Sequence, residues 1–158
     1  MSDQPDVNEA AALARLLDES EIQKVLFRYA QALDEKDWTL LATCFLESAI
    51  GDYEMIGRLE GYAAIEGICR KALDPMSHTQ HLIGNVLINV DQDEALSSCY
   101  FQAQHVRPDF PGGSMNIIAG RYEDQLVRTD AGWKIRERKL SVLWTSGNAA
   151  IHELDGNA

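Results

Sequence analysis

The sequence predicts an α+β fold, a cone-shaped α+β barrel in which N-terminal helices pack on a strongly curved, mainly antiparallel sheet. Helical spacing of apolar residues is confined to the first half of the chain, four long β-rich runs fill the second half, and short turn sequences divide those runs. The 158 residues suffice for one hydrophobic core. We therefore expect a single domain over residues 18–148, between an N-terminal tail at 1–17 that is partly helical or disordered and a C-terminal tail at 149–158.

The predicted helices come first in the chain. Apolar residues recur three and four positions apart on one face between Asp18 and Leu33, and both Asp18 and Ser20 begin a capping-box pattern. A second helix is expected from Asp37 to Phe45, where large apolar residues again share a face. The connection between these helices is short, so they should form a helical hairpin.

The pattern changes after the second predicted helix. A short strand is expected over Ala49–Met55, followed by a turn over Gly57–Gly61. A third helix is predicted over Tyr62–Leu73, and Pro75 ends it because proline cannot continue a helix.

The last half of the chain predicts an antiparallel meander. Its strands are expected at Gln80–Val90, Ala95–Val106, Met115–Thr129 and Trp133–Trp144, with turns at Asp91–Asp93, Pro108–Gly113 and Asp130–Gly132. Helices that cover only part of a curved sheet leave a pocket between the layers. We expect the functional site in that pocket.

Composition argues against several classes of partner. The formal charge of −11 would repel phosphate backbones and anionic membrane surfaces, so neither nucleic acid nor membrane is an expected partner. No apolar run approaches the roughly 20 residues that span a bilayer. The first residues lack the apolar stretch of a secretory signal, so we expect a cytoplasmic location. Cys44, Cys69 and Cys99 lie among apolar neighbours and are predicted to be reduced core residues.

The sequence contains none of the common cofactor or phosphate-binding motifs, such as GxGxxG, GxxxxGK[ST], CxxC or HExxH. We therefore expect no cofactor, and chemistry that relies on proton transfer by side chains. The four histidines are then the first candidates: His78, His81, His105 and His152. We set His152 aside because it lies in the predicted C-terminal tail.

The histidines do not predict a metal site. His78 and His81 are three residues apart on a strand, so their side chains should point to opposite faces and should not bind one metal ion together with His105. His81 lies in a strand that has at least one buried face. From position alone, it is as consistent with a hydrogen-bonded core residue as with a catalytic base.

Four further polar residues have two readings each. Asp34 follows the apolar face of the first helix, next to the negative end of the helix dipole, and is either an acid of the site or a residue of the connecting turn. Tyr29 and Tyr53 are either hydrogen-bond donors to a carbonyl group or core aromatics. Arg138 is either a surface charge paired across strands or a cation of the pocket.

Four segments resemble one known family when they are taken in order. These are Arg28–Trp38, with the sequence RYAQALDEKDW, then His81–Val86, Gly120–Asp124 and Gly132–Ile135. Their order and spacing resemble the SnoaL-like domain family of the nuclear transport factor 2-like superfamily, over about residues 18–148. The resemblance implies the same cone-shaped fold as the hydrophobic pattern.

The resemblance also implies a site. Scytalone dehydratase, bile-acid 7-alpha-dehydratase and lindane dehydrochlorinase are members that use an aspartate after the first helix and a histidine on a central strand, and Asp34 and His81 occupy these positions. The carboxylate would then orient the imidazole, and the imidazole would take a proton from the substrate. The same members imply further roles in the pocket for Tyr29, Tyr53, His105 and Arg138.

The function expected from these residues is a dehydratase-type lyase that acts on a small hydrophobic cyclic, polyketide-like or steroid-like molecule. Leu33, Gly120 and Tyr122 depart from scytalone dehydratase, so the same substrate is not expected. An isomerase or a cyclase on the same scaffold is one alternative, and a non-catalytic binding module is another. The family further implies a homodimer or homotrimer formed through the outer face of the sheet.

Overall fold

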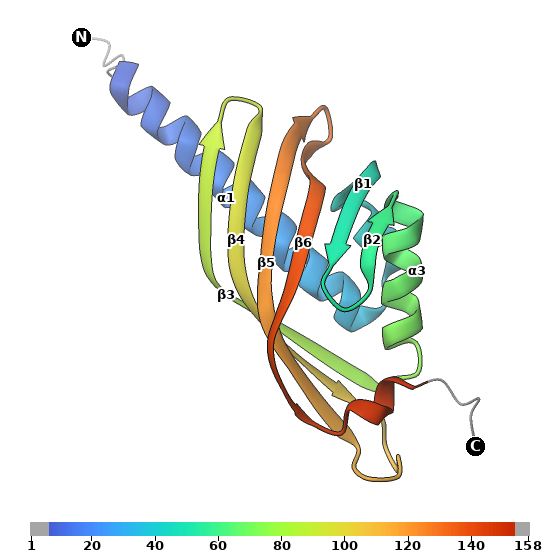
Figure 1. Ribbon diagram of the computed structural model, residues 1–158. Coiled ribbons are helices and arrows are strands. Elements are labelled where there is room, and N and C mark those ends of the chain that lie inside the picture. Colours follow the sequence, from blue (N-terminus) through green and yellow to red (C-terminus); the bar gives the residue numbers. More distant parts are fainter. Residues whose placement is uncertain (1–6, 154–158) are drawn as a thin grey trace.

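The computed structural model describes residues 7–153, which form two main helices, a curved sheet and short connecting elements (Figure 1). In chain order the elements are α1 (Val7–Glu35), α2 (Trp38–Ala42), β1 (Phe45–Tyr53), β2 (Gly57–Glu60), α3 (Tyr62–Leu73), β3 (His78–Asp91), β4 (Glu94–Val106), β5 (Met115–Thr129), β6 (Gly132–Gly147) and the 3-10 helix η1 (Ala149–His152). The third helix has the predicted bounds, and the four long strands lie where the turn sequences placed them.

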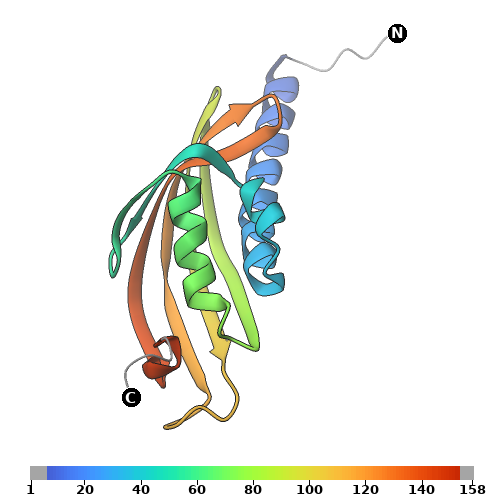
Figure 2. The same ribbon diagram turned by 90° about the vertical axis from the view of Figure 1, so that its right-hand side faces the viewer.

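Within the described part of the chain, the sheet has six strands in the order β2-β1-β6-β5-β4-β3. Every neighbouring pair is antiparallel except β1 and β6, which are parallel. Register shifts interrupt β3–β4 between Gly84 and Leu87, and β5–β6 between Ala119 and Gly120. Such shifts increase the local bend of a sheet. Both α1 and α3 lie on the same side of the bent sheet (Figure 2), so the predicted cone-shaped α+β fold is confirmed.

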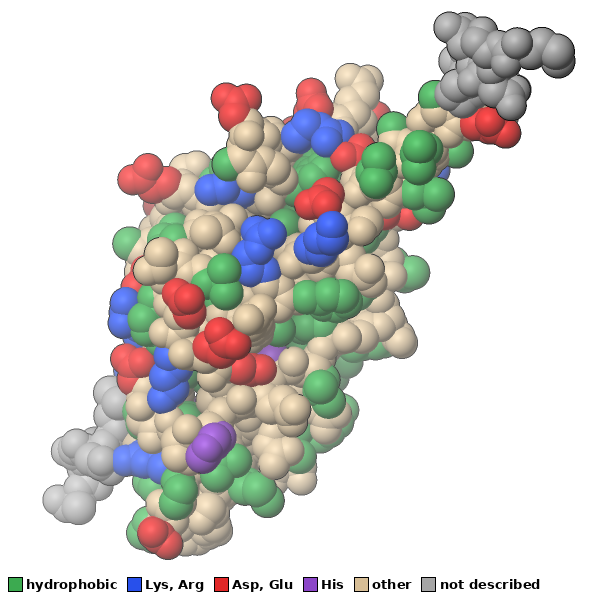
Figure 3. Space-filling view, turned by 180° about the vertical axis from the view of Figure 1, so that it is seen from behind, with side chains coloured by type: hydrophobic (Ala, Val, Ile, Leu, Met, Phe, Trp, Pro, Cys, Tyr) green, Lys and Arg blue, Asp and Glu red, His purple; other side chains and the backbone are tan. Residues whose placement is uncertain are grey.

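Helix α1 begins at Val7, before the predicted start near Asp18, so the described part of the predicted tail, residues 7–17, is helical. The alanine-rich stretch has a high intrinsic helix propensity, which outweighs the capping pattern inside it. This first part projects beyond the sheet (Figure 1), and hydrophobic side chains lie on its surface (Figure 3). Its Leu13, Leu16 and Leu17 are exposed. Residues 1–6 lie outside the described residues. No helix among those described is long and apolar enough to cross a membrane.

Two further boundaries differ from the predictions. Helix α2 ends at Ala42, and Phe45 instead begins β1, where it pairs with Ile135 of β6. The apolar spacing that predicted a longer helix is a property of buried strand residues as well. The predicted turn after β1 is largely the edge strand β2, which Gly57 can begin because its φ of 98° favours glycine.

The predicted C-terminal tail is in part a folded element. Ile151 of η1 is fully buried, and Arg107 donates hydrogen bonds to the carbonyl oxygens of Ile151 and Glu153. Asn148 begins η1, since its side chain accepts a hydrogen bond from the backbone N–H of Ala150. These contacts hold the chain end against β5, and residues 154–158 lie outside the described residues.

The core lies between α1, α3 and the concave face of the sheet. The predicted apolar face of α1 is buried there, and Cys44, Cys69 and Cys99 are buried free thiols, as predicted for core cysteines. The buried residues of α1 are Ile22, Val25, Leu26, Tyr29, Ala30, Ala32 and Leu33. The face that was predicted from helical spacing is therefore the face that packs on the sheet.

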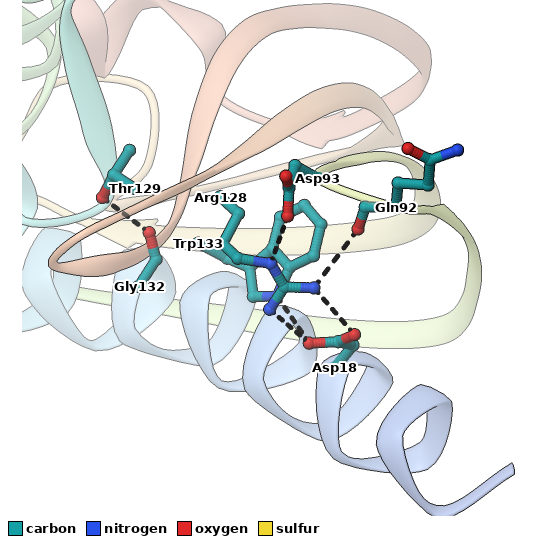
Figure 4. Close-up of polar contacts among 7 residues, drawn as sticks. All are labelled: Asp18, Gln92, Asp93, Arg128, Thr129, Gly132 and Trp133. Carbon is teal, nitrogen blue, oxygen red and sulfur yellow. Dashed lines mark hydrogen bonds and ion pairs between the residues drawn. The ribbon is translucent and has the colours of Figure 1, made fainter. Parts of the chain in front are cut away.

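A polar network holds α1 against two turns of the sheet (Figure 4). Arg128 of β5 binds both carboxylate oxygens of Asp18 at 2.7 and 2.9 Å and donates to Asp93 at 2.8 Å. Its guanidinium also stacks 4.5 Å over the ring of Trp133, whose indole N–H donates to Asp18. Asp18 therefore anchors the middle of α1 rather than capping its start.

Replacing Arg128 by alanine is expected to lower the free energy of unfolding by about 1–2 kcal/mol, because a bidentate ion pair and a cation–π contact are lost at a partly exposed site. Urea denaturation followed by circular dichroism measures this change. Arg121→Ala is the control, since Arg121 forms an exposed ion pair with Glu123, and it should change stability by less than about 0.5 kcal/mol. Equal losses in both variants would contradict the anchoring role of Arg128.

Candidate active site

Asp34 and His81 form a hydrogen-bonded pair between the last turn of α1 and the edge strand β3. Asp34 Oδ1 lies 2.6 Å from His81 Nδ1, and the backbone N–H of His81 donates to Oδ2 at 2.9 Å. The Thr79 hydroxyl donates to the same carboxylate at 3.2 Å. Helix α1 ends just beyond Asp34, where Lys36 has a φ of 53°, so the carboxylate is presented to β3 rather than to solvent. This placement contradicts the reading of Asp34 as a connecting-turn residue.

The charge of Asp34 follows from its partners. Burial by itself would raise the pKa of its carboxyl, but the hydrogen bonds from the His81 ring, the His81 backbone and Thr79 outweigh burial and lower it. The carboxylate is therefore ionised at neutral pH and accepts the Nδ1–H of His81. This leaves Nε2 of His81 as the nitrogen with a free electron pair. The arrangement can act as a base.

A cavity of about 170 Å³ adjoins this pair, and His81 is among the residues that line it. Most of the lining is apolar and comes from α1, α3 and the concave face of the sheet. Met55 and Ile56, which connect β1 to β2, also line it and are 77% and 51% exposed. They mark an apolar rim at which a hydrophobic ligand can enter from solvent.

Two buried polar atoms among the lining residues have no hydrogen-bond partner: Tyr53 Oη and His105 Nδ1. Burial raises the pKa of Tyr53 well above its ordinary value, so its hydroxyl keeps its proton and can donate. Burial, with smaller effects from His152 and His81, lowers the pKa of His105 to about 3, so its ring is neutral at pH 7. Nδ1 has no partner in the protein and can accept a hydrogen bond when the ring proton is on the other nitrogen.

Arg138 lies in the core, so its reading as a surface charge is wrong. It is fully buried, and its Nε and Nη2 each donate to the Asp124 carboxylate at 2.7 Å. Its guanidinium carbon stacks 4.1 Å from the ring centroid of Tyr29 and 4.2 Å from that of Tyr122. Tyr29 and Tyr122 line the cavity, whereas Arg138 is not among the lining residues. The arginine therefore lies behind the two tyrosines that form part of the cavity wall.

Tyr29 is a core aromatic, which is one of its two predicted readings, and it also faces the cavity. It is buried, packs edge-on against Phe45 and Tyr122, and also lines the cavity. Burial raises the pKa of Tyr29 to about 12, and its hydroxyl interacts with Tyr122 and Arg138. It stays protonated at neutral pH and is already partnered, unlike the hydroxyl of Tyr53.

Sequence reasoning missed His152. Its ring lies 4.7 Å from that of His105, measured between ring centroids, and its Nε2 lies 3.2 Å from Asn116 Oδ1. The buried Ile151 next to it, and Asn148 as the cap of a short helix, were the signals that this segment is folded. Within residues 7–153, no group of three or more histidine, cysteine, aspartate or glutamate side chains is arranged to hold a metal ion.

Comparison with known proteins gives a family match over most of the chain. Residues 14–139 match the SnoaL-like domain family. The uncharacterized protein Rv2910c of Mycobacterium tuberculosis is 31% identical over 130 residues, which covers 80% of this chain and 86% of that protein. The uncharacterized protein Mb2934c of Mycobacterium bovis matches equally well.

Solved structures share the fold. The Kfla4162 protein from Kribbella flavida has a TM-score of 0.81 at 24% identity, covering 87% of this chain and 98% of that one. The hexachlorocyclohexane dehydrochlorinase LinA-type3 from Novosphingobium barchaimii LL02 has a TM-score of 0.76 at 19% identity, covering 92% and 99%. A nuclear transport factor 2-like superfamily protein from Salmonella enterica has a TM-score of 0.74 at 19% identity, covering 85% and 97%.

The lowered pKa of Asp34 predicts a pH dependence of stability. A carboxyl whose pKa is lower in the folded state stabilises the fold above its unfolded pKa of about 3.9, and this stabilisation is lost as the pH falls through the folded value. The difference in unfolding free energy between wild type and Asp34→Asn should therefore be largest near neutral pH and should shrink in acid. Urea titrations at several pH values measure it. Asp130→Asn, an exposed turn substitution, is the control, and a pH-independent difference for Asp34→Asn would contradict the assignment.

Arg138→Met is expected to cost about 3–5 kcal/mol of unfolding free energy, because the Asp124 carboxylate stays buried without a partner. The double variant Arg138→Met with Asp124→Leu should recover most of this loss, since no charge is then left in the core. Thermal and urea denaturation of the three proteins test this. A single variant as stable as wild type would show that the ion pair is not a structural element of the core.

Proposed function

The chain belongs to the SnoaL-like domain family, and we propose that it is a cofactor-independent lyase of the dehydratase type. The observation that carries this proposal is the Asp34–His81 pair at the wall of an apolar cavity that also holds two unpartnered polar atoms. A donor at Tyr53 and an acceptor at His105 complement a ligand that carries both a carbonyl and a hydroxyl group. We therefore infer a small hydrophobic hydroxy-carbonyl compound as substrate.

In the proposed reaction His81 Nε2 removes a proton from the carbon next to the carbonyl group. Asp34 holds the Nδ1–H and stabilises the imidazolium that forms. Tyr53 Oη donates to the carbonyl oxygen, on which negative charge develops. The hydroxyl on the next carbon then leaves with the proton returned by His81, so the products are water and a conjugated carbonyl compound.

The role proposed for His105 is to accept a hydrogen bond from the substrate. With a pKa lowered to about 3 its ring carries no ionisable proton to give at neutral pH, but the free Nδ1 can accept a hydrogen bond from the substrate hydroxyl. This contact would orient the leaving group toward His81, whose ring centroid lies 5.8 Å from that of His105.

The size of the cavity limits the substrate. A volume of about 170 Å³ is below the roughly 300 Å³ at which pockets for drug-sized ligands begin. We therefore favour a compact cyclic substrate over a steroid-like one. The dehydrochlorinase among the similar structures is also named for an elimination, which supports the reaction type.

An isomerase or a cyclase would use the same proton abstraction and differ in its product. A non-catalytic binding module would use the same cavity without turnover.

Self-association is a further proposal, because apolar side chains are exposed on the uncovered face of the sheet: Leu82, Tyr100, Leu143 and Trp144. A cytoplasmic location stays a prediction.

A thermal-shift screen of hydroxylated cyclic ketones and polyketide-like aromatics should identify ligands that raise the melting temperature, and wild type should convert some of them to dehydrated products. His81→Ala and Asp34→Asn are expected to lower turnover by about 10²–10⁴-fold, because each disables the base. Mass spectrometry of the products measures turnover, and circular dichroism verifies that each variant folds.

His78→Ala is the matched control, because His78 is an exposed histidine on the same strand and should leave turnover unchanged. Full turnover by folded His81→Ala would rule out the dyad. Ligands that bind both wild type and His81→Ala without any conversion would favour the binding module.

A further inference from the structure

The C-terminal segment brings a third histidine to the row formed by His81 and His105. The ring centroids of His105 and His152 lie 4.7 Å apart with an interplanar angle of 78°, which is an edge-to-face contact. The ring of His81 packs on the other side of His105, with ring centroids 5.8 Å apart and an interplanar angle of 90°. His105 is therefore held between a ring from β3 and a ring from η1.

His152 is fixed from several sides. Its Nε2 lies 3.2 Å from Asn116 Oδ1, and the amide nitrogen of Asn116 donates to the carbonyl oxygen of Ser146. This second bond makes Oδ1 the acceptor, so His152 Nε2 donates to it. The ring also interacts with the backbone of Ala72 in α3. Asn116 is 1% exposed, so the anchor of His152 is rigid.

The same asparagine also faces His105. Asn116 of β5 is the register partner of His105 in β4, and its backbone interacts with the His105 ring. The side chain of Asn116 therefore holds His152 while its backbone holds His105. Both constraints act on the orientation of the His105 ring, whose unpartnered Nδ1 lies next to the cavity.

We propose that His152 is a positioning residue, which fixes the orientation of the His105 ring so that Nδ1 stays available to a ligand in the pocket. His152 does not line the cavity and so acts through His105 rather than on the ligand. The consequence for turnover rests on the proposed function, whereas the effect on His105 is a property of the free protein. The two can therefore fail separately.

The test is nuclear magnetic resonance of the histidine side chains in wild type, His152→Ala and His78→Ala. Wild type and His78→Ala should show nuclear Overhauser effects between the ring protons of His105 and those of His81, because the two rings are in edge-to-face contact. In His152→Ala these effects should weaken, because the His105 ring can then turn.

His152→Gln is a second variant in case His152→Ala does not fold. Its amide can still donate to Asn116, but it offers no ring to His105, so the same weakening is expected. A folded variant of either kind with unchanged effects between His105 and His81 would overturn the proposal. For a hydroxylated ligand found in the thermal-shift screen, His152→Ala should weaken affinity by about 5–10-fold, the loss of one hydrogen bond. Unchanged affinity together with changed His105 signals would contradict the role of Nδ1 in binding and leave the positioning role intact.

Discussion

The site depends on one carboxylate that joins a helix to an edge strand. Asp34 lies where the negative end of the α1 dipole disfavours an acid, yet it accepts hydrogen bonds from Thr79 and from both the backbone and the ring of His81. These bonds lower its pKa in spite of burial. Because the same contacts fix the approach of α1 to β3, the position of the helix and the orientation of the imidazole are set together.

A second carboxylate, that of Asp124, has a different role. Asp124 pairs with Arg138 in the core, and the guanidinium lies behind Tyr29 and Tyr122, which form part of the cavity wall. The Arg138–Asp124 pair thus supports neutral aromatic side chains and does not contact the cavity. The cavity itself presents Tyr53 and His105 as uncharged polar groups, which suits a neutral substrate with a carbonyl and a hydroxyl.

Periodicity was sufficient to predict the layers of the fold, since the buried face of α1 and the four long strands follow directly from spacing and turn chemistry. Periodicity did not predict the structure where one sequence pattern is compatible with two structures. The spacing of Phe45 suits a helix or a buried strand, and the capping pattern at Asp18 lies inside a longer alanine-rich helix. Arg138 was misjudged because a cross-strand charge pair looks the same in sequence whether it is exposed or buried. His152 was set aside with the predicted C-terminal tail. The contacts that fold η1 come from distant residues such as Arg107, which the local sequence does not reveal.

The central claim is that His81, held by Asp34, removes a proton from a carbon next to a carbonyl group. The most direct measurement is the exchange of that proton for deuterium in D₂O, followed by ¹H nuclear magnetic resonance for ligands found in the thermal-shift screen. It reports proton abstraction whether the reaction ends in elimination, isomerisation or ring closure. The account predicts exchange with wild type that falls by about 10²–10⁴-fold in folded His81→Ala. Equal exchange rates in the two proteins would contradict it.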